Sequence, residues 1–298
     1  MRVFVTGASG LIGRAVTREL LNTGHTVLGL ARSDKAAEVI SDLGAEVHRG
    51  SLYDLDSLKA GAAASDGVIH LAFDMDFTNV RKSCDTDQAA IRAMADALAG
   101  SNRPLIITSG TLLLPRDRVA TEDDVYDPST GPLAIRGESE ELAKSLASNG
   151  VRSAVMRLAP TNHGDGDAMF MAEIIHIARA KGVSAYIGDG LNRWPAVHYL
   201  DTAVAFRLAL EQGSAGATYH VVAEEGVRMK DIAEAIGKKL EVPVVSKSME
   251  QAQEHFGFFA ALVGANSPVS SKKTREALGW TPKQWTLLED LEHGKYFE

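Results

Sequence analysis

The sequence predicts an α/β fold in which a doubly wound parallel sheet carries a smaller C-terminal lobe. A short apolar run at residues 3–5 leads into a glycine-rich turn and then into a helical apolar pattern. Apolar strands and amphipathic helices then alternate as far as residue 160, which is typical of a parallel sheet covered on both faces. Residues 1–160 are therefore expected to form the sheet domain. Residues 161–298 should form the lobe, with at least one strand, near 218–222, returning to the sheet.

The glycine-rich turn is the strongest functional signal. Gly7, Gly10 and Gly13 lie between the first strand and the first helix, together with Ser9, Leu11 and Ile12. Such a turn directs free backbone N–H groups and the positive end of a helix dipole at one point, where glycine allows a pyrophosphate to approach closely. These six residues predict a Rossmann-like dinucleotide site. The alternative is a turn that only connects strand to helix.

The second strand, expected at 26–31, ends at a basic residue. In this type of unit an acidic residue at this point selects NAD, whereas a basic residue pairs with the additional phosphate of NADP. Here the residues are Arg32 and Ser33, with Lys35 close by. The sequence therefore favours NADP over NAD. The alternative is a solvated arginine at a strand end.

Composition limits the remaining classes. The chain has 298 residues and a formal net charge of −8, which argues against nucleic acid or an anionic membrane as a partner. There is one cysteine, Cys84, and no apolar run of transmembrane length. The first strand begins too close to Met1 for a signal peptide. We expect a cytoplasmic protein.

Several motifs resemble one superfamily. The spacing G-x-x-G-x-x-G after Thr6, the run V-I-H-L-A at 68–72, and the segments 157–166 and 188–201 resemble the extended short-chain dehydrogenase/reductases, also called the NAD-dependent epimerase/dehydratase family. The resemblance implies a small-molecule carbonyl substrate. It also implies a homodimer, formed through helices near 86–98 and 138–146. The further cofactor contacts that it implies are Ser51, Leu52, Leu71, Ala72, Thr108 and Pro160.

The catalytic helix departs from the pattern of this family, which has Y-x-x-x-K. One alignment puts Arg136 at the tyrosine and Glu140 at the lysine; a shift of four residues puts Pro132 at the tyrosine and Arg136 at the lysine. Neither alignment supplies a tyrosine. Arginine cannot replace it as the acid, because a guanidinium stays protonated, but it can hold an oxyanion, a carboxylate or ribose hydroxyls.

The remaining candidates for chemistry follow the fifth and sixth strands. The resemblance implies that Ser109 or Thr111 hydrogen-bonds the substrate carbonyl, unless the hydroxyl only satisfies its own turn. His163 is the best replacement acid, because imidazole titrates near neutrality. Alternatively, His163 only lines the pocket. No metal site is expected, and His70, inside a buried strand, is interpreted as a core residue.

The sequence therefore leads to a primary functional hypothesis and two alternatives. The primary hypothesis is an NADP-dependent oxidoreductase that reduces a carbonyl compound, with Ser109, Arg136 and His163 as its catalytic residues. The missing tyrosine and lysine favour a different class, a non-catalytic NADP(H)-binding redox sensor that acts through a protein partner. An epimerase or dehydratase is the third hypothesis.

Overall fold

The computed structural model describes residues 1–74, 76, 78–116 and 118–298. Its centre is a seven-stranded sheet in the order β10-β6-β5-β4-β1-β2-β3, and every neighbouring pair is parallel. This order confirms the predicted doubly wound α/β fold. The strands are β1 (Arg2–Thr6), β2 (Thr26–Ala31), β3 (Glu46–Arg49), β4 (Gly67–His70), β5 (Pro104–Gly110), β6 (Arg152–Leu158) and β10 (Ala217–Val221).

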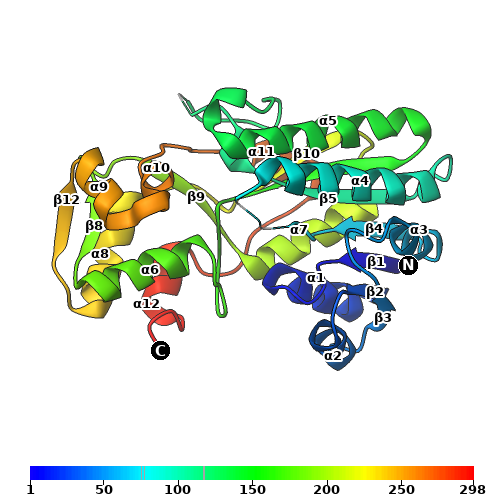
Figure 1. Ribbon diagram of the computed structural model, residues 1–298, viewed down its shortest axis with the longest axis horizontal. Helices are drawn as coiled ribbons and strands as arrows, with labels where there is room; N and C mark the ends of the chain where they lie inside the picture. Colours follow the sequence, from blue (N-terminus) through cyan, green and yellow to red (C-terminus); the bar gives the residue numbers. More distant parts are fainter. Residues whose placement is uncertain (75, 77, 117) are drawn as a thin grey trace.

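Helices cover both faces of this sheet (Figure 1). Successive side chains of a strand point to opposite faces, so in β1 Val3 and Val5 join one apolar cluster while Phe4 joins the other. The face of Val3 is covered by α1 (Leu11–Asn22), α2 (Asp34–Asp42), α7 (Tyr199–Gln212) and α11 (Lys272–Leu278). The face of Phe4 is covered by α3 (Leu55–Ala63), α4 (Val80–Leu98) and α5 (Gly137–Ser145).

The lobe lies beyond the carboxyl edge of the sheet, on the left of Figure 1. It has its own apolar core, in which Trp194 is fully buried. Its strands form one sheet of three, β7 (Thr161–His163), β9 (Arg193–His198) and β11 (Glu224–Arg228), and one of two, β8 (Ser184–Ile187) and β12 (Val244–Lys247). Its helices are α6 (Phe170–Lys181), α8 (Met229–Leu240), α9 (Met249–Phe256), α10 (Ala260–Val263) and α12 (Leu287–His293).

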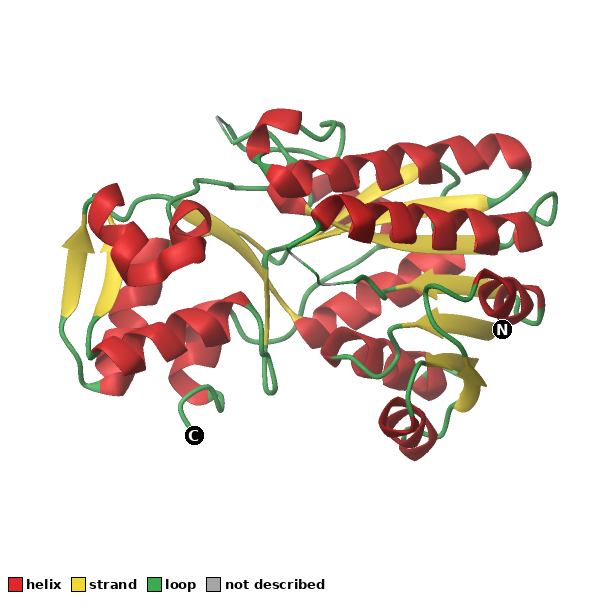
Figure 2. Ribbon diagram, in the orientation of Figure 1, coloured by secondary structure: helices red, strands yellow, loops and turns green. Residues whose placement is uncertain are grey.

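The chain crosses between the two parts more than once (Figure 2). After β9 it returns to the sheet, where α7 packs against α1 and β10 pairs with β6, Ala217 opposite Ala154. Residues 199–221 therefore belong spatially to the sheet and not to the lobe. No helix in the described part of the chain combines the length and apolarity needed to cross a bilayer.

Candidate active site

The glycine turn has the geometry that an anion site requires. Gly7 has a φ of +71°, and the N–H of Gly10 donates to its carbonyl oxygen at 3.0 Å. A Cβ on Gly13 would lie 2.0 Å from that same oxygen, so the helix can start this close to the strand only with glycine there. Helix α1 begins after Gly10 with no side-chain cap. Its first N–H groups are left for a ligand.

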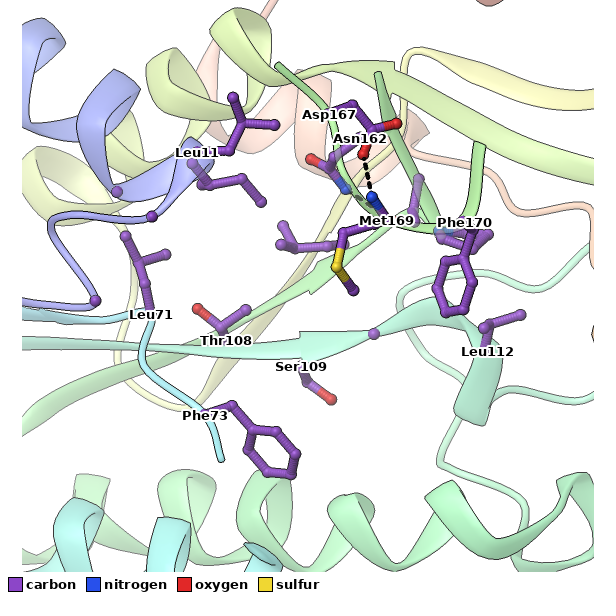
Figure 3. Close-up of a pocket in the computed structure, with 18 of the residues that line it drawn as sticks. Leu11, Leu71, Phe73, Thr108, Ser109, Leu112, Asn162, Asp167, Met169 and Phe170 are labelled. Carbon is purple, nitrogen blue, oxygen red and sulfur yellow. Dashed lines mark hydrogen bonds between the residues drawn. The ribbon is translucent and has the colours of Figure 1, made fainter. Parts of the chain in front are cut away.

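A cavity of about 610 Å³ opens beside this turn, at the carboxyl edge of the sheet. We call it the cleft. Figure 3 shows Leu11 and Leu71 at one end, Phe170 and Leu112 at the other, and Thr108 on β5 between them. Ten residues predicted to bind cofactor or substrate line the cleft: Gly7, Gly10, Leu11, Ile12, Gly13, Leu71, Thr108, Ser109, Arg136 and Pro160.

The residues predicted at the adenosine end lie outside this lining. Arg32 follows β2 on the same edge of the sheet; it is exposed, and its side chain makes no ion pair with any described residue. The hydroxyl of Ser33 caps α2 by accepting from the N–H of Ala36 at 3.2 Å. The end of β2 lies on the same carboxyl edge of the sheet as the cleft, and the adenosine contacts of Arg32 and Ser33 stay a prediction.

Four further predicted contacts have mainly local roles. Ser51 accepts a hydrogen bond from the N–H of Tyr53 at 3.3 Å, and Leu52 packs against the core under α3. Ser9 is half-buried within the turn. A Cβ on Gly7 would lie 2.9 Å from the nitrogen of Ala72, so Ala72 forms the surface on which the turn rests.

Ser109 takes part in a buried charged network. Its hydroxyl donates to Oε1 of Glu140 at 2.5 Å. Glu140 also pairs with Arg157, whose Nη2 lies 2.5 Å from Oε2 and whose Nε donates to both carboxylate oxygens. Both charged side chains are 0% exposed. Nη1 of Arg157 donates to the carbonyl of Asp124 at 2.7 Å and contacts Nε2 of His220 at 3.3 Å. Burial and the charge of Arg157 lower the pKa of His220 to about 4, so its ring is neutral.

This network changes the expected role of Ser109. A hydroxyl carries one proton, and that of Ser109 already goes to Glu140. Toward a ligand in the cleft, the Ser109 hydroxyl is therefore an acceptor and not a donor. Thr111, the alternative candidate, also lines the cleft, and its Oγ1 has no partner among the described residues. Among the described residues on the substrate side of the cleft, Thr111 and Arg136 have side-chain donors left for a carbonyl oxygen.

Arg136 ends a 3-10 helix, Pro132–Arg136, just before α5. Its guanidinium lies 3.9 Å from the ring centre of Phe73, and Nη2 donates to the carbonyl of Thr108 at 3.2 Å. Nε is buried and has no partner in the described part of the chain. Glu140, one turn later, lies beneath Ser109 and pairs with Arg157. Of the two catalytic-helix positions, Arg136 faces the cleft.

The structure does not support His163 as the proton donor. Its side chain is 0% exposed, and it is absent from the cleft lining. Nδ1 lies 2.8 Å from Oδ2 of Asp290 on α12. Residues 161–163 form the strand β7, in which neighbouring side chains point to opposite faces. Asn162 therefore lines the cleft, while His163 points into the lobe.

A second buried network holds α5 in place and explains His70. Nδ1 of His70 lies 2.7 Å from Oγ1 of Thr6, and Nε2 lies 3.2 Å from Asp87. Ser139 on α5 donates to the other carboxylate oxygen of Asp87 at 2.7 Å. Burial alone would raise the pKa of Asp87, but the hydrogen bonds from His70 and Ser139 and the charge of Arg136 lower it overall. His70 is a core residue, as the sequence indicated.

Several residues of the cleft are not recognisable from the sequence. Arg14 on α1 lines the cleft as a half-buried cation. Phe73, Leu133, Met169 and Phe170 form apolar walls. Phe73, Leu133 and Met169 come from segments between regular elements or at their ends, where no periodicity marks the inward side. Phe170 begins the apolar stripe of helix α6, and that stripe does not by itself indicate the cleft. Arg14 had one usable signal, a cation in the first turn of a helix whose N-terminus was already predicted to bind phosphate.

Together these features define a Rossmann-type α/β protein in which the glycine turn and the predicted substrate-binding residues share one cleft at the carboxyl edge of the sheet. Residues 3–223 match the NAD dependent epimerase/dehydratase family, and the chain belongs to that family. The resemblance seen in the motifs is confirmed. Membership places the chain among NAD(P)-binding enzymes of the oxidoreductase and epimerase type.

The similarity to known proteins covers most or nearly all of the chain. The uncharacterised Saccharomyces cerevisiae protein YLL056C is 49% identical over 293 residues, 98% of each chain. A 4-hydroxy-2-methyl-3-oxo-4-farnesyl-3,4-dihydroquinoline-1-oxide ketoreductase of Stigmatella aurantiaca is 26% identical, covering 86% of this chain and 80% of its own. The crystal structure of PA4631, a nucleoside-diphosphate-sugar epimerase from Pseudomonas aeruginosa, shares the fold (TM-score 0.79, 20% identity, 99% and 96% coverage).

Proposed function

We propose that the protein is an NADP-dependent oxidoreductase that reduces a carbonyl compound without the usual tyrosine and lysine. The observation that carries this proposal is the position of Arg136 and Ser109 in the same cleft as the glycine turn. When bound, the cofactor would supply hydride. The turn and Arg14 would hold its phosphates, with Arg32 at the adenosine end.

The side chains of the cleft would stabilise the carbonyl oxygen and position the alcohol that forms. Negative charge develops on the carbonyl oxygen during reduction, and Arg136 would stabilise it without giving up a proton. Ser109, whose own proton is held by Glu140, would accept a hydrogen bond from the hydroxyl that forms. With His163 outside the cleft, the proton would come from water. The ketoreductase among the relatives supports carbonyl reduction.

The proposal is tested by mixing the purified protein with NADPH and a panel of aldehydes and ketones. We expect loss of NADPH absorbance together with formation of the matching alcohol, detected by mass spectrometry. If NADPH fluorescence shifts on binding but no member of the panel oxidises the cofactor, the reductase proposal is wrong. The alternative of a redox sensor acting through a protein partner would then be favoured.

Cofactor preference gives a separate prediction. Arg32→Asp should weaken NADPH binding by about tenfold to a hundredfold, because a charged hydrogen bond is replaced by repulsion. NADH affinity should change little. Arg18→Asp makes the same charge change at an exposed arginine on α1, away from the end of β2, and controls for long-range electrostatics. Fluorescence titration with both coenzymes measures this, and equal losses for both would rule out Arg32 as the selector of NADP.

A further inference from the structure

The walls of the cleft beyond the glycine turn are largely apolar. Phe73 follows β4, Leu112 follows β5, and Leu133 precedes α5. Met169 and Phe170 close the lobe side (Figure 3). Apolar area that is withdrawn from water on binding stabilises a complex by roughly 25 cal/mol per Å². The part of the substrate that fills this end is therefore expected to be a hydrocarbon chain or ring.

The charges of the cleft limit what else the substrate carries. Among the described residues that line it, Arg14, Arg136 and Asp167 are ordinarily charged. Asp167 is on the lobe side, where it accepts hydrogen bonds from the N–H of Met169 and the hydroxyl of Tyr296, both at 2.8 Å. No described lining residue on the lobe side is a cation. A nucleoside-diphosphate group placed there would meet a carboxylate and no counter-charge.

Arg136 is the described cation on the substrate side of the cleft; its charge acts on the buried Asp87, but no described carboxylate lies within ion-pair distance of it. Its guanidinium rests on Phe73 and uses Nη2 toward Thr108, yet it forms no ion pair with any described residue. A guanidinium offers five N–H donors in a planar fork that fits a carboxylate. Arg136 is half-buried, with Nε fully buried and without a partner among the described residues, and a desolvated cation is costly unless it is paired. A substrate carboxylate would supply the missing partner.

Arg136 also limits the distance between this carboxylate and the reacting carbonyl. Its Nη2 is bonded to Thr108, the residue next to Ser109, so the guanidinium lies beside the carbonyl site of the proposed reaction. The guanidinium of Arg136 can contact both the carboxylate and the reacting carbonyl oxygen only if these two groups are close together on the substrate. We infer that the cleft takes a 2-oxo or 3-oxo acid with an apolar chain, and that Arg136 binds its carboxylate. This inference rests on the proposed reductase function.

The test compares 2-oxooctanoate with its methyl ester as substrates for the NADPH-loaded enzyme. The ketone of the ester is more electrophilic than the ketone of the acid, so without a specific contact to the carboxylate the ester would be reduced faster. We expect kcat/KM to favour the acid by about tenfold to a hundredfold, the usual value of a charge-assisted hydrogen bond. Arg136→Met also removes the contact to the carbonyl oxygen, so kcat/KM should fall for both substrates, and in the residual activity the preference for the acid should fall to about one. Arg136→Lys should keep part of it, and Arg81→Met, a surface control on α4, should keep all of it.

A binding measurement separates this inference from the proposed function. Octanoate and 1-octanol are titrated calorimetrically into the NADP-loaded protein, and octanoate should bind through Arg136 whether or not turnover occurs. If Arg136→Met does not fold, this octanoate-against-octanol comparison in the wild type decides. The inference is overturned if the ester is reduced as well as the acid, or if octanoate binds no better than octanol. If other ketones are reduced in the same assays, the proposed reductase function still holds even though the inference about the carboxylate is wrong.

Discussion

Replacing Gly13 with alanine is expected to reduce NADPH affinity by more than a hundredfold, about 2.8 kcal/mol. The new Cβ would lie 2.0 Å from the carbonyl oxygen of Gly7 and 2.8 Å from Cα of Ala8. Both are backbone atoms that cannot rotate away, so the turn must open and its N–H groups must separate. The measurement is calorimetric titration of the folded variant with NADPH.

Gly44→Ala is the matched control for this change. Gly44 has a φ of +83° and open space around its missing side chain, so alanine there adds backbone strain without a clash. We expect a cost of about 1–2 kcal/mol in the free energy of unfolding and unchanged NADPH affinity. Gly13→Ala protein that is folded and binds NADPH like the wild type would show that the turn does not hold the cofactor.

Glu140→Gln is expected to lower the free energy of unfolding by about 3–5 kcal/mol. The substitution leaves the guanidinium of Arg157 buried at 0% exposure without its counter-charge. It also changes the group that accepts the proton of Ser109. Urea denaturation followed by circular dichroism measures the loss.

The adjacent residue provides the control. Glu141 is 55% exposed and lies 3.4 Å from Lys144, so Glu141→Gln should change the free energy of unfolding by less than about 1 kcal/mol. If both variants were equally stable, Arg157 and Glu140 would not form the charged network that fixes Ser109. The role of Ser109 as an acceptor toward the cleft would then lose its basis.

The sheet and the geometry of the glycine turn could be predicted because local residues determine both. An apolar strand, three glycines at fixed spacing and an amphipathic helix are recognisable within about twenty residues. The NADP preference stays a prediction, because Arg32 is exposed and no described residue fixes the position of its side chain through an ion pair. Pairing of two chains through α4 and α5 also stays a prediction.

The catalytic assignments were less predictable because they depend on which way side chains point. The imidazole of His163 is chemically suited to proton transfer, but the short strand β7 turns it toward Asp290 and brings Asn162 to the cleft instead. Glu140 looks like an ordinary helix-surface residue. Its burial follows from Arg157, which comes from a strand that begins after α5 has ended. Contacts between residues far apart in the sequence leave no pattern in the local sequence around either residue.

Calorimetric titration of the wild-type protein with NADPH and NADH tests the central claim most directly. Our account predicts one binding site per chain, tighter binding of NADPH than of NADH, and a higher unfolding temperature in the presence of NADPH. Absence of heat and of thermal protection with both coenzymes, in oxidised and reduced form, would contradict it. In that case neither the glycine turn nor the cleft beside it would be a cofactor site.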